Sequence, residues 1–114
     1  MRLPRARDAK VPRSKVLGYL LSRAHPVGRL KAAFFCEFGF SAESWEALAE
    51  ALAEHAASNE VAVSEKTEFG TRFAVDGPLN TPSGRHPVIR SVWFVELGQS
   101  TPRLVTAYPI RSRA

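Results

Sequence analysis

The chain contains little cysteine, which limits the classes of protein to which it can belong. Cys36 is the only cysteine among 114 residues, so no disulfide can form within the chain. Small secreted domains usually depend on such bonds, whereas a lone thiol is typical of a reducing compartment. We therefore expect a cytoplasmic protein. Cys36 lies in the apolar run FFCEF, and we interpret it as a small buried hydrophobe rather than a nucleophile.

The sequence also lacks long hydrophobic runs and the common cofactor motifs. No apolar stretch approaches the roughly 20 residues that cross a bilayer, and the basic N-terminus is not followed by the hydrophobic stretch of a secretory signal. We thus expect no membrane association. The glycine-rich motifs of nucleotide-phosphate loops are missing. The histidines (His25, His55 and His86) lie far apart, so we expect neither a metal nor another cofactor.

Charge, in contrast, is abundant and unevenly distributed, with a net charge of +5. Residues 1–31 hold nine lysines and arginines against one acid. Residues 32–70 hold one lysine against eight glutamates, and residues 71–114 hold six arginines against two acids. Such a chain can fold with one acidic and one basic side, and a basic side attracts phosphate polyanions. The alternative is a solvated surface that keeps the protein soluble.

The composition, 45% hydrophobic and 24% charged, is that of one folded domain with a modest core. Residues 1–12 are basic and contain two prolines, so we expect an extended arm there and a single domain over residues 13–114. After the arm, apolar residues recur at helical spacing in three segments. These expected helices begin at Ser14, at Val27 and at Ala42, and the last runs to about Ala57.

After Asn59 the hydrophobic period changes to two, which indicates strands. Turn residues delimit four strand-like segments: 60–66, 71–79, 88–97 and 103–110. The expected core face of the third strand carries Ile89, Trp93, Val95 and Leu97. In the fourth strand, regular alternation places four residues on one face: Leu104, Thr106, Tyr108 and Ile110. We predict an α+β fold in which two to three N-terminal helices pack on a four-stranded antiparallel meander.

Arginines recur along the strand-rich half, and a sheet that carries several arginines is suited to binding phosphate. Metal-free cleavage of RNA needs a base for the ribose 2′-hydroxyl proton, an acid for the leaving 5′-oxygen and a cation beside the phosphate. Residues of suitable type are His25, Lys31, Arg72, Arg85, His86, Arg90, Thr106 and Tyr108. Their spacing is not a motif in itself.

Each candidate also has a structural interpretation. A charge in the middle of a strand, such as Arg90, needs an exposed face or a carboxylate partner. Thr106 and Tyr108 are ordinary strand formers. Lys31 lies near the start of a helix, where lysines are commonly solvated, and His86 lies in or next to a loop.

Several strings within the chain are specific when taken together. They are YLLSRAHPVGRLKAAFF at 19–35, FGTRFAVDGPL at 69–79, PSGRHPVIRSVWFV at 82–95 and PRLVTAYP at 102–109. In combination they resemble a bacterial family known only as domain of unknown function 6883, and the resemblance covers nearly the whole chain. The family name carries no activity, although genes of this family are commonly paired with a small second gene.

A further resemblance does imply an activity. Helices followed by a four-stranded antiparallel sheet that ends in a strand like PRLVTAYP resemble the superfamily of barnase, EndoU, the colicin tRNases and RelE-type toxins. This resemblance implies a metal-independent ribonuclease toxin of a toxin–antitoxin or competition system. It also implies RNA as the substrate and a small cognate antitoxin or immunity protein as the partner.

The catalytic residues that this resemblance implies are His25, Lys31, Arg90, Thr106 and Tyr108. The expected nucleic-acid contacts are Arg72, Arg85, His86 and Arg103, although many relatives fill the Arg85–His86 loop differently. The chain departs from those enzymes because it has no His–Glu or His–His pair that could be assigned as base and acid.

Two other interpretations stay open. The chain could be a non-catalytic module that binds nucleic acid or a partner protein, which predicts binding with a steep salt dependence and no turnover. It could also be a protein-interaction domain that uses the glutamate ladder of the third helix: Glu46, Glu50 and Glu54.

Overall fold

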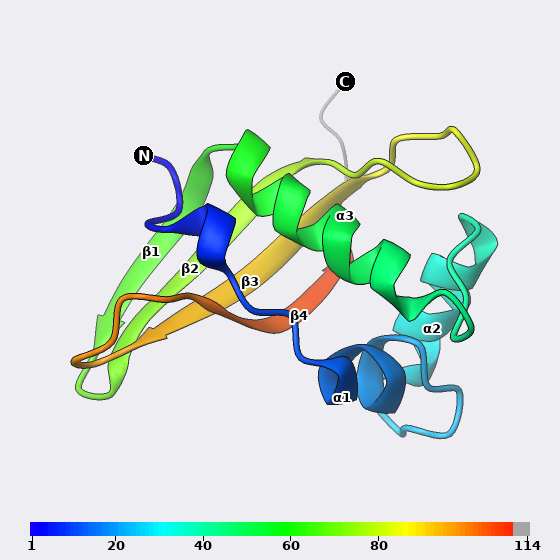
Figure 1. The fold of residues 1–114 in the computed structure, drawn as a ribbon, viewed down its shortest axis with the longest axis horizontal. Coiled ribbons are helices and arrows are strands. Elements are labelled where there is room, and N and C mark those ends of the chain that lie inside the picture. Colours follow the sequence, from blue (N-terminus) through cyan, green and yellow to red (C-terminus); the bar gives the residue numbers. More distant parts are fainter. Residues whose placement is uncertain (111–114) are drawn as a thin grey trace.

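The computed structural model describes residues 1–110. Residues 111–114, the end of the domain expected over residues 13–114, lie outside the described range. The predicted fold class is confirmed, because helices come first in the chain and a four-stranded antiparallel sheet follows them (Figure 1).

Helical segments occupy most of the first half of the chain. They are the 3-10 turn η1 (Ala6–Asp8), the short helix α1 (Arg13–Lys15), the π-helical turn η2 (Val16–Leu20), α2 (Arg29–Glu37) and α3 (Trp45–Ser58). α2 ends two residues before Gly39, whose φ of 99° is a left-handed conformation that favours glycine. None of the helices within residues 1–110 has the length and apolarity needed to cross a bilayer.

The sheet is a simple meander with the order β1-β2-β3-β4. Its strands are β1 (Val61–Thr67), β2 (Gly70–Pro78), β3 (Val88–Glu96) and β4 (Arg103–Pro109). In Figure 1, α3 lies across one face of the sheet, while the turns that join β1 to β2 and β3 to β4 project beyond the helices. β1 is an edge strand, and nearly all of its residues are exposed.

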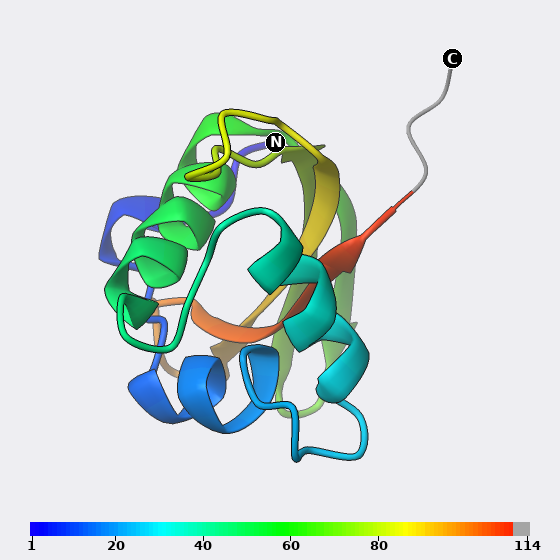
Figure 2. The same cartoon turned by 90° about the vertical axis from the view of Figure 1, so that its right-hand side faces the viewer.

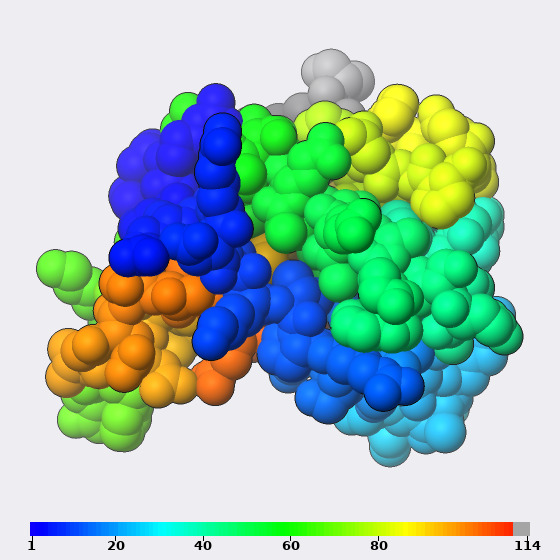
Figure 3. All heavy atoms as spheres, in the orientation of Figure 1, coloured from blue at the N-terminus to red at the C-terminus, as the bar shows by residue number. Residues whose placement is uncertain are grey.

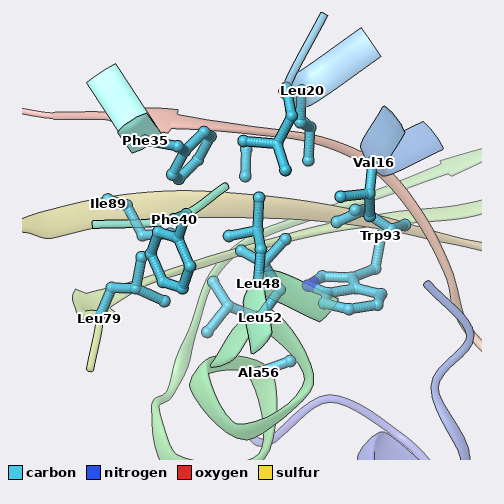
Figure 4. Close-up of a cluster of buried hydrophobic side chains, with 14 of the residues drawn as sticks. Val16, Leu20, Phe35, Phe40, Leu48, Leu52, Ala56, Leu79, Ile89 and Trp93 are labelled. Carbon is cyan, nitrogen blue, oxygen red and sulfur yellow. The ribbon is translucent and has the colours of Figure 1, made fainter. Parts of the chain in front are cut away.

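The core lies between α3 and the sheet. Trp93 on β3 is fully buried beside Leu48 and Leu52 of α3 (Figure 4). Phe35 of α2 and Leu20 of η2 close the same cluster.

One expected core residue, Leu97, is not in the core. Leu97 is 77% exposed because β3 ends at Glu96, and the Leu97 N–H donates to the carbonyl of Phe69 in the neighbouring turn at 2.9 Å. The prediction that Leu97 faces the core is therefore wrong.

The N-terminal segment, residues 1–12, lies against the rest of the domain (Figure 3). Leu3 is 3% exposed and belongs to the hydrophobic core. The Lys10 N–H donates to the Pro102 carbonyl, and the Leu104 N–H donates to the Lys10 carbonyl, both at 2.9 Å. The segment thereby pairs with the start of β4 and satisfies backbone groups of this edge strand.

A β-bulge in β4 changes which face its side chains occupy. Thr106 is paired with Val92, whereas Leu104 is paired with Trp93, so Val105 is an extra residue in the ladder. Leu104 consequently packs under the helices, while Thr106 lies on the opposite face. The expectation that Leu104 shares a face with Thr106 and Tyr108 is wrong, because a bulge breaks the period of two.

A buried polar network ties α3 to the sheet. The Ser91 hydroxyl lies 2.9 Å from Nδ1 of His55 and accepts the Nε1–H of Trp93 at 2.8 Å. Nε2 of His55 lies 3.0 Å from the Gly77 carbonyl. A carbonyl can only accept, so Nε2 carries the hydrogen and Nδ1 accepts from Ser91. The ring is thus held neutral between β2 and β3.

This network predicts a stability that depends on pH. Burial lowers the pKa of His55 below its ordinary value of 6.5, and hydrogen bonds to Gly77 and Ile89 only partly oppose the shift. The unfolded chain therefore takes up a proton more readily than the folded state. This contribution to stability is complete above a pH of about 6.5 and is lost as the pH falls from there towards the folded pKa.

The test is urea denaturation of the wild type and of His55→Leu at several values between pH 5 and pH 7.5. We expect the variant to lose about 1–3 kcal/mol at neutral pH, because the Gly77 carbonyl loses its donor. The free energy of unfolding of the variant should also no longer show the His55-dependent decrease below a pH of about 6.5. The matched control His86→Leu changes an exposed histidine and should leave the decline intact. An unchanged decline in His55→Leu would contradict this account.

Candidate functional site

The face of the sheet turned away from α3 is called the outer face here. Ser91 contacts His55 of α3, so strand alternation places its neighbours Arg90 and Val92 on the other side. The registers of β2, β3 and β4 then define the outer face by the following residues: Arg72, Ala74, Asp76, Arg90, Val92, Phe94, Arg103, Thr106 and Tyr108.

The centre of the outer face is a fixed arginine. Arg90 stands between Asp76 on β2 and Tyr108 on β4, each directly opposite it in the ladder. Its Nε and Nη2 donate to the two carboxylate oxygens of Asp76 at 2.7 and 2.8 Å. The two side chains are only 29% and 27% exposed, and such bidentate pairs hold the guanidinium in one orientation.

The charge of Arg90 is secured by its neighbours. The hydrogen bond to Asp76 raises the pKa of Arg90, partial burial opposes the shift, and the adjacent Tyr108 hydroxyl adds to it. Asp76 accepts one N–H each from Nε and Nη2, so the remaining N–H groups of Nη1 and Nη2 are those that a further anionic group can bind. This geometry suits a phosphate held beside Tyr108.

The next row across the sheet joins the outer face to the helical half of the chain. Ala74, Val92 and Thr106 lie side by side on β2, β3 and β4, and the first two are fully buried. The Thr106 hydroxyl lies 3.1 Å from the hydroxyl of Tyr19, which comes from η2. Figure 2 shows η2 and α2 beside β4, the edge strand that Tyr19 contacts.

Three cationic or potentially cationic side chains surround the ring of Tyr19. The Nζ atoms of Lys15 and Lys31 lie 5.4 and 5.5 Å from the ring centroid. The His25 ring meets it edge to face, with 5.0 Å between the centroids. The fold therefore brings His25 and Lys31 to Tyr19, and Tyr19 in turn contacts Thr106.

The hydrogen bonds of His25 limit what this residue can do. Its Nδ1 accepts the backbone N–H groups of Val27 and Gly28, each at 3.0 Å. In the neutral ring the hydrogen therefore lies on Nε2. His25 can donate a hydrogen bond to a substrate through Nε2, but its Nδ1 lone pair is already used by the backbone.

The expected nucleic-acid contacts fall in two other places. Arg72 and Arg103 lie on either side of Phe94 in one row near the far end of the outer face, and Arg103 pairs with Glu96 at 3.0 Å. Arg85 lies in the loop between β2 and β3 and stacks over Phe38, with 4.4 Å to the ring centroid.

His86, in the same loop, is exposed. The four expected nucleic-acid contacts therefore do not form one patch with Arg90. Arg72 and Arg103 share its face of the sheet, whereas Arg85 is held at the end of α2 by its stacking on Phe38.

Two residues of this arrangement were not predicted from the sequence. Asp76 could have been found only with the register of β2 against β3, which the loop over residues 79–87 leaves undefined. Tyr19 lies inside an apolar run, where an aromatic residue is normally assigned to the core. Lys15 lies one helical turn before Tyr19, whereas Lys31 reaches it only because the loop over residues 21–28 folds the chain back.

Within residues 1–110, no three or more histidine, cysteine, aspartate or glutamate side chains are grouped so that they could hold a metal ion. The exposed glutamates of α3 (Glu46, Glu50 and Glu54) lie on the other side of the sheet.

The sequence matches a protein-family model over almost its full length. The model of the family described as "Domain of unknown function (DUF6883)" matches residues 2–111. The chain belongs to this family. No curated protein matches it.

A known structure shares the fold of this DUF6883 domain. It is a chain of the contact-dependent growth inhibition toxin–immunity protein complex from Klebsiella pneumoniae 342. The TM-score is 0.74 at 20% sequence identity, over 94% of this chain and 97% of that chain. At this level of identity the likeness shows the fold.

The loop around Tyr19 predicts different outcomes for two neighbouring glycines. A Cβ on Gly28 would clash with the Tyr19 carbonyl oxygen and lie 3.1 Å from Cδ1 of its ring, whereas a Cβ on Gly18 would meet nothing within 4 Å. We expect Gly28→Ala to destabilise the domain by about 1–3 kcal/mol. Gly18→Ala should be neutral or stabilise it by up to about 1 kcal/mol. Thermal unfolding of the two variants tests this, and equal melting temperatures would contradict the packing described here.

Proposed function

We propose that this DUF6883 domain is a metal-independent endoribonuclease and acts as the toxin of a bacterial toxin–antitoxin or competition system. The observation that carries the proposal is Arg90, which Asp76 holds in place opposite Tyr108, on a face that also carries the Thr106–Tyr19 contact. In this proposal the phosphate clamp and the proton-transfer groups lie on adjacent rows of the sheet, Arg90 with Tyr108 and Val92 with Thr106.

The residues have distinct roles in this proposal. Arg90 binds a non-bridging phosphate oxygen and stabilises the charge that develops on the phosphate. Tyr108, beside Arg90, takes the proton of the 2′-hydroxyl. Lys31 adds a second positive charge. Thr106 positions the side chains beside it, and His25 donates a hydrogen bond to the substrate through Nε2.

The resemblance to toxin ribonucleases and the fold shared with a chain of a toxin–immunity protein complex support the same biological setting. The partner in this proposal is a small cognate antitoxin or immunity protein that blocks the outer face. Because the proposed substrate is RNA, the domain acts in the cytoplasm of a bacterial cell in this proposal.

The second candidate function is a module of such a system that binds RNA or a partner without cutting RNA. The row of Arg72, Phe94 and Arg103 favours it, because an aromatic ring between arginines can stack a base while the charges meet phosphates. The ion pair of Arg103 with Glu96 reduces the charge that this row can offer.

Cleavage of end-labelled tRNA and total RNA in EDTA distinguishes the two candidates. We expect discrete products from the wild type and a rate at least 100-fold lower for Arg90→Ala, because one preorganised phosphate clamp contributes about that much. Asp76→Asn should also slow cleavage, since Arg90 then loses its bidentate partner. The matched control Arg7→Ala removes an exposed arginine of η1 and should cut like the wild type.

Folding is followed alongside by circular dichroism, since removal of either partner leaves a partly buried polar group and costs about 1–3 kcal/mol. Intact RNA with all folded proteins would contradict the ribonuclease proposal. Retarded but intact RNA, with a steep loss of affinity as salt rises, would favour the binding module.

A further inference from the structure

We propose that Tyr19 is the proton donor to the leaving 5′-oxygen of the RNA. This inference rests on the proposed ribonuclease function and adds a catalytic residue to it. The Tyr19 hydroxyl lies 3.1 Å from the hydroxyl of Thr106, which comes 87 residues later in the chain. This contact holds Tyr19 at the outer face.

The local backbone is built around this side chain. Tyr19 belongs to the single π-helical turn of the structure's described residues, and such turns occur frequently at functional sites. The turn at residues 25–28 closes against it, because Gly28 packs on the Tyr19 carbonyl and His25 packs on its ring. The hydroxyl is consequently fixed in direction while the side chain keeps part of its surface open to solvent.

The surroundings stabilise the anion that proton donation leaves behind. Partial burial alone raises the pKa of Tyr19, but the hydrogen bond with Thr106 and the charges of Lys31 and Lys15 outweigh it, and the pKa lies below the ordinary 10.0. Neither lysine forms an ion pair with a carboxylate of residues 1–110. Their charge therefore acts on the tyrosine and on any phosphate beside it.

With this assignment, each proton that moves in the reaction has a donor and an acceptor. The 2′-oxygen attacks phosphorus as its proton passes to the oxygen of Tyr108, the base of the proposed function. The bond from phosphorus to the 5′-oxygen breaks, and the electron pair on that oxygen takes the proton of Tyr19. The products are a 2′,3′-cyclic phosphate and a 5′-hydroxyl. Solvent then returns a proton to Tyr19 and removes the one on Tyr108.

His25 and Lys31 are less suited to this step. The Nδ1 of His25 accepts two backbone N–H groups, so this nitrogen cannot also carry the hydrogen that an imidazolium acid needs, and Nε2–H serves as a hydrogen-bond donor. Lys31 stabilises the Tyr19 oxygen by its charge. The hydroxyl of Tyr19 contacts Thr106 of the sheet, its backbone belongs to the π-helical turn, and both lysines lie beside its ring.

The test uses the variant Tyr19→Phe, which keeps the ring and removes only the hydroxyl. The RNA linkage cut by the wild type is mapped first, and an oligonucleotide with that linkage is made with either a 5′-oxygen or a 5′-sulfur as the leaving atom. A thiolate leaves without protonation, so it needs no acid. We expect Tyr19→Phe to cut the oxygen linkage about 100-fold more slowly or worse, and the sulfur linkage at close to the wild-type rate.

Two outcomes overturn the role of Tyr19 while leaving the ribonuclease in place. Equal losses on both linkages would make Tyr19 a packing residue, and unchanged cleavage of the oxygen linkage would remove it from the reaction. A wild type that cuts neither RNA nor the oligonucleotides would instead overturn the proposed function and this inference with it.

A second measurement does not need RNA. The chain has two tyrosines, so its spectrum with ¹³Cζ-labelled tyrosine contains two ring signals, and Tyr19→Phe assigns them. We expect the Tyr19 signal to titrate below 10.0 and to move upward in Lys31→Gln, whereas Arg23→Gln, an exposed charge on the same loop, should leave it unchanged. Titration of Tyr19 at its ordinary value in the wild type would contradict the electrostatic part of the proposal.

Discussion

The arrangement of the outer face depends on one extra residue in an edge strand. Without the bulge at Val105, the alternation that buries Leu104 would also direct Thr106 and Tyr108 towards the helices. With it, β4 buries Leu104 and Ala107 on one face and presents Thr106 and Tyr108 on the other. Bulges commonly redirect side chains next to functional sites, and this one places two hydroxyl groups in register with Arg90 and Val92.

The two faces of β3 carry different kinds of side chain and make different contacts. Ser91 and Trp93 face α3, where the neutral His55 ring joins the helix to the sheet through fully satisfied hydrogen bonds. Arg90 faces the other way and is held by Asp76. A strand that is anchored on one side can support a charged residue on the other, because the backbone positions of the pair are fixed by the core. The domain therefore keeps its hydrophobic core and its proposed substrate-binding face on opposite sides of one sheet.

The sequence predicted the fold class and the strand segments well, because periodicity and turn residues are local properties. Gly39, for example, indicated the end of α2 directly. The pairing of Arg90 with Asp76 was out of reach, since it depends on a register set across a nine-residue loop. The assignment of Leu104 to one face with Thr106 and Tyr108 was wrong, because no residue type signals the bulge at Val105. Tyr19 was missed because Lys31 and Thr106 reach it only in three dimensions.

The most direct test of the account is an NMR titration of the ¹⁵N-labelled domain with a fully 2′-O-methylated RNA hairpin, which lacks the nucleophile and cannot be cut. If the outer face is the surface that acts on RNA, the Nε–H signal of Arg90 and the amides of Thr106, Tyr108 and Tyr19 should show the largest shift changes. These changes should weaken as salt is added. Changes confined to α3 or to residues 1–12, or no change at all, would contradict the central claim that this face of the sheet binds the substrate.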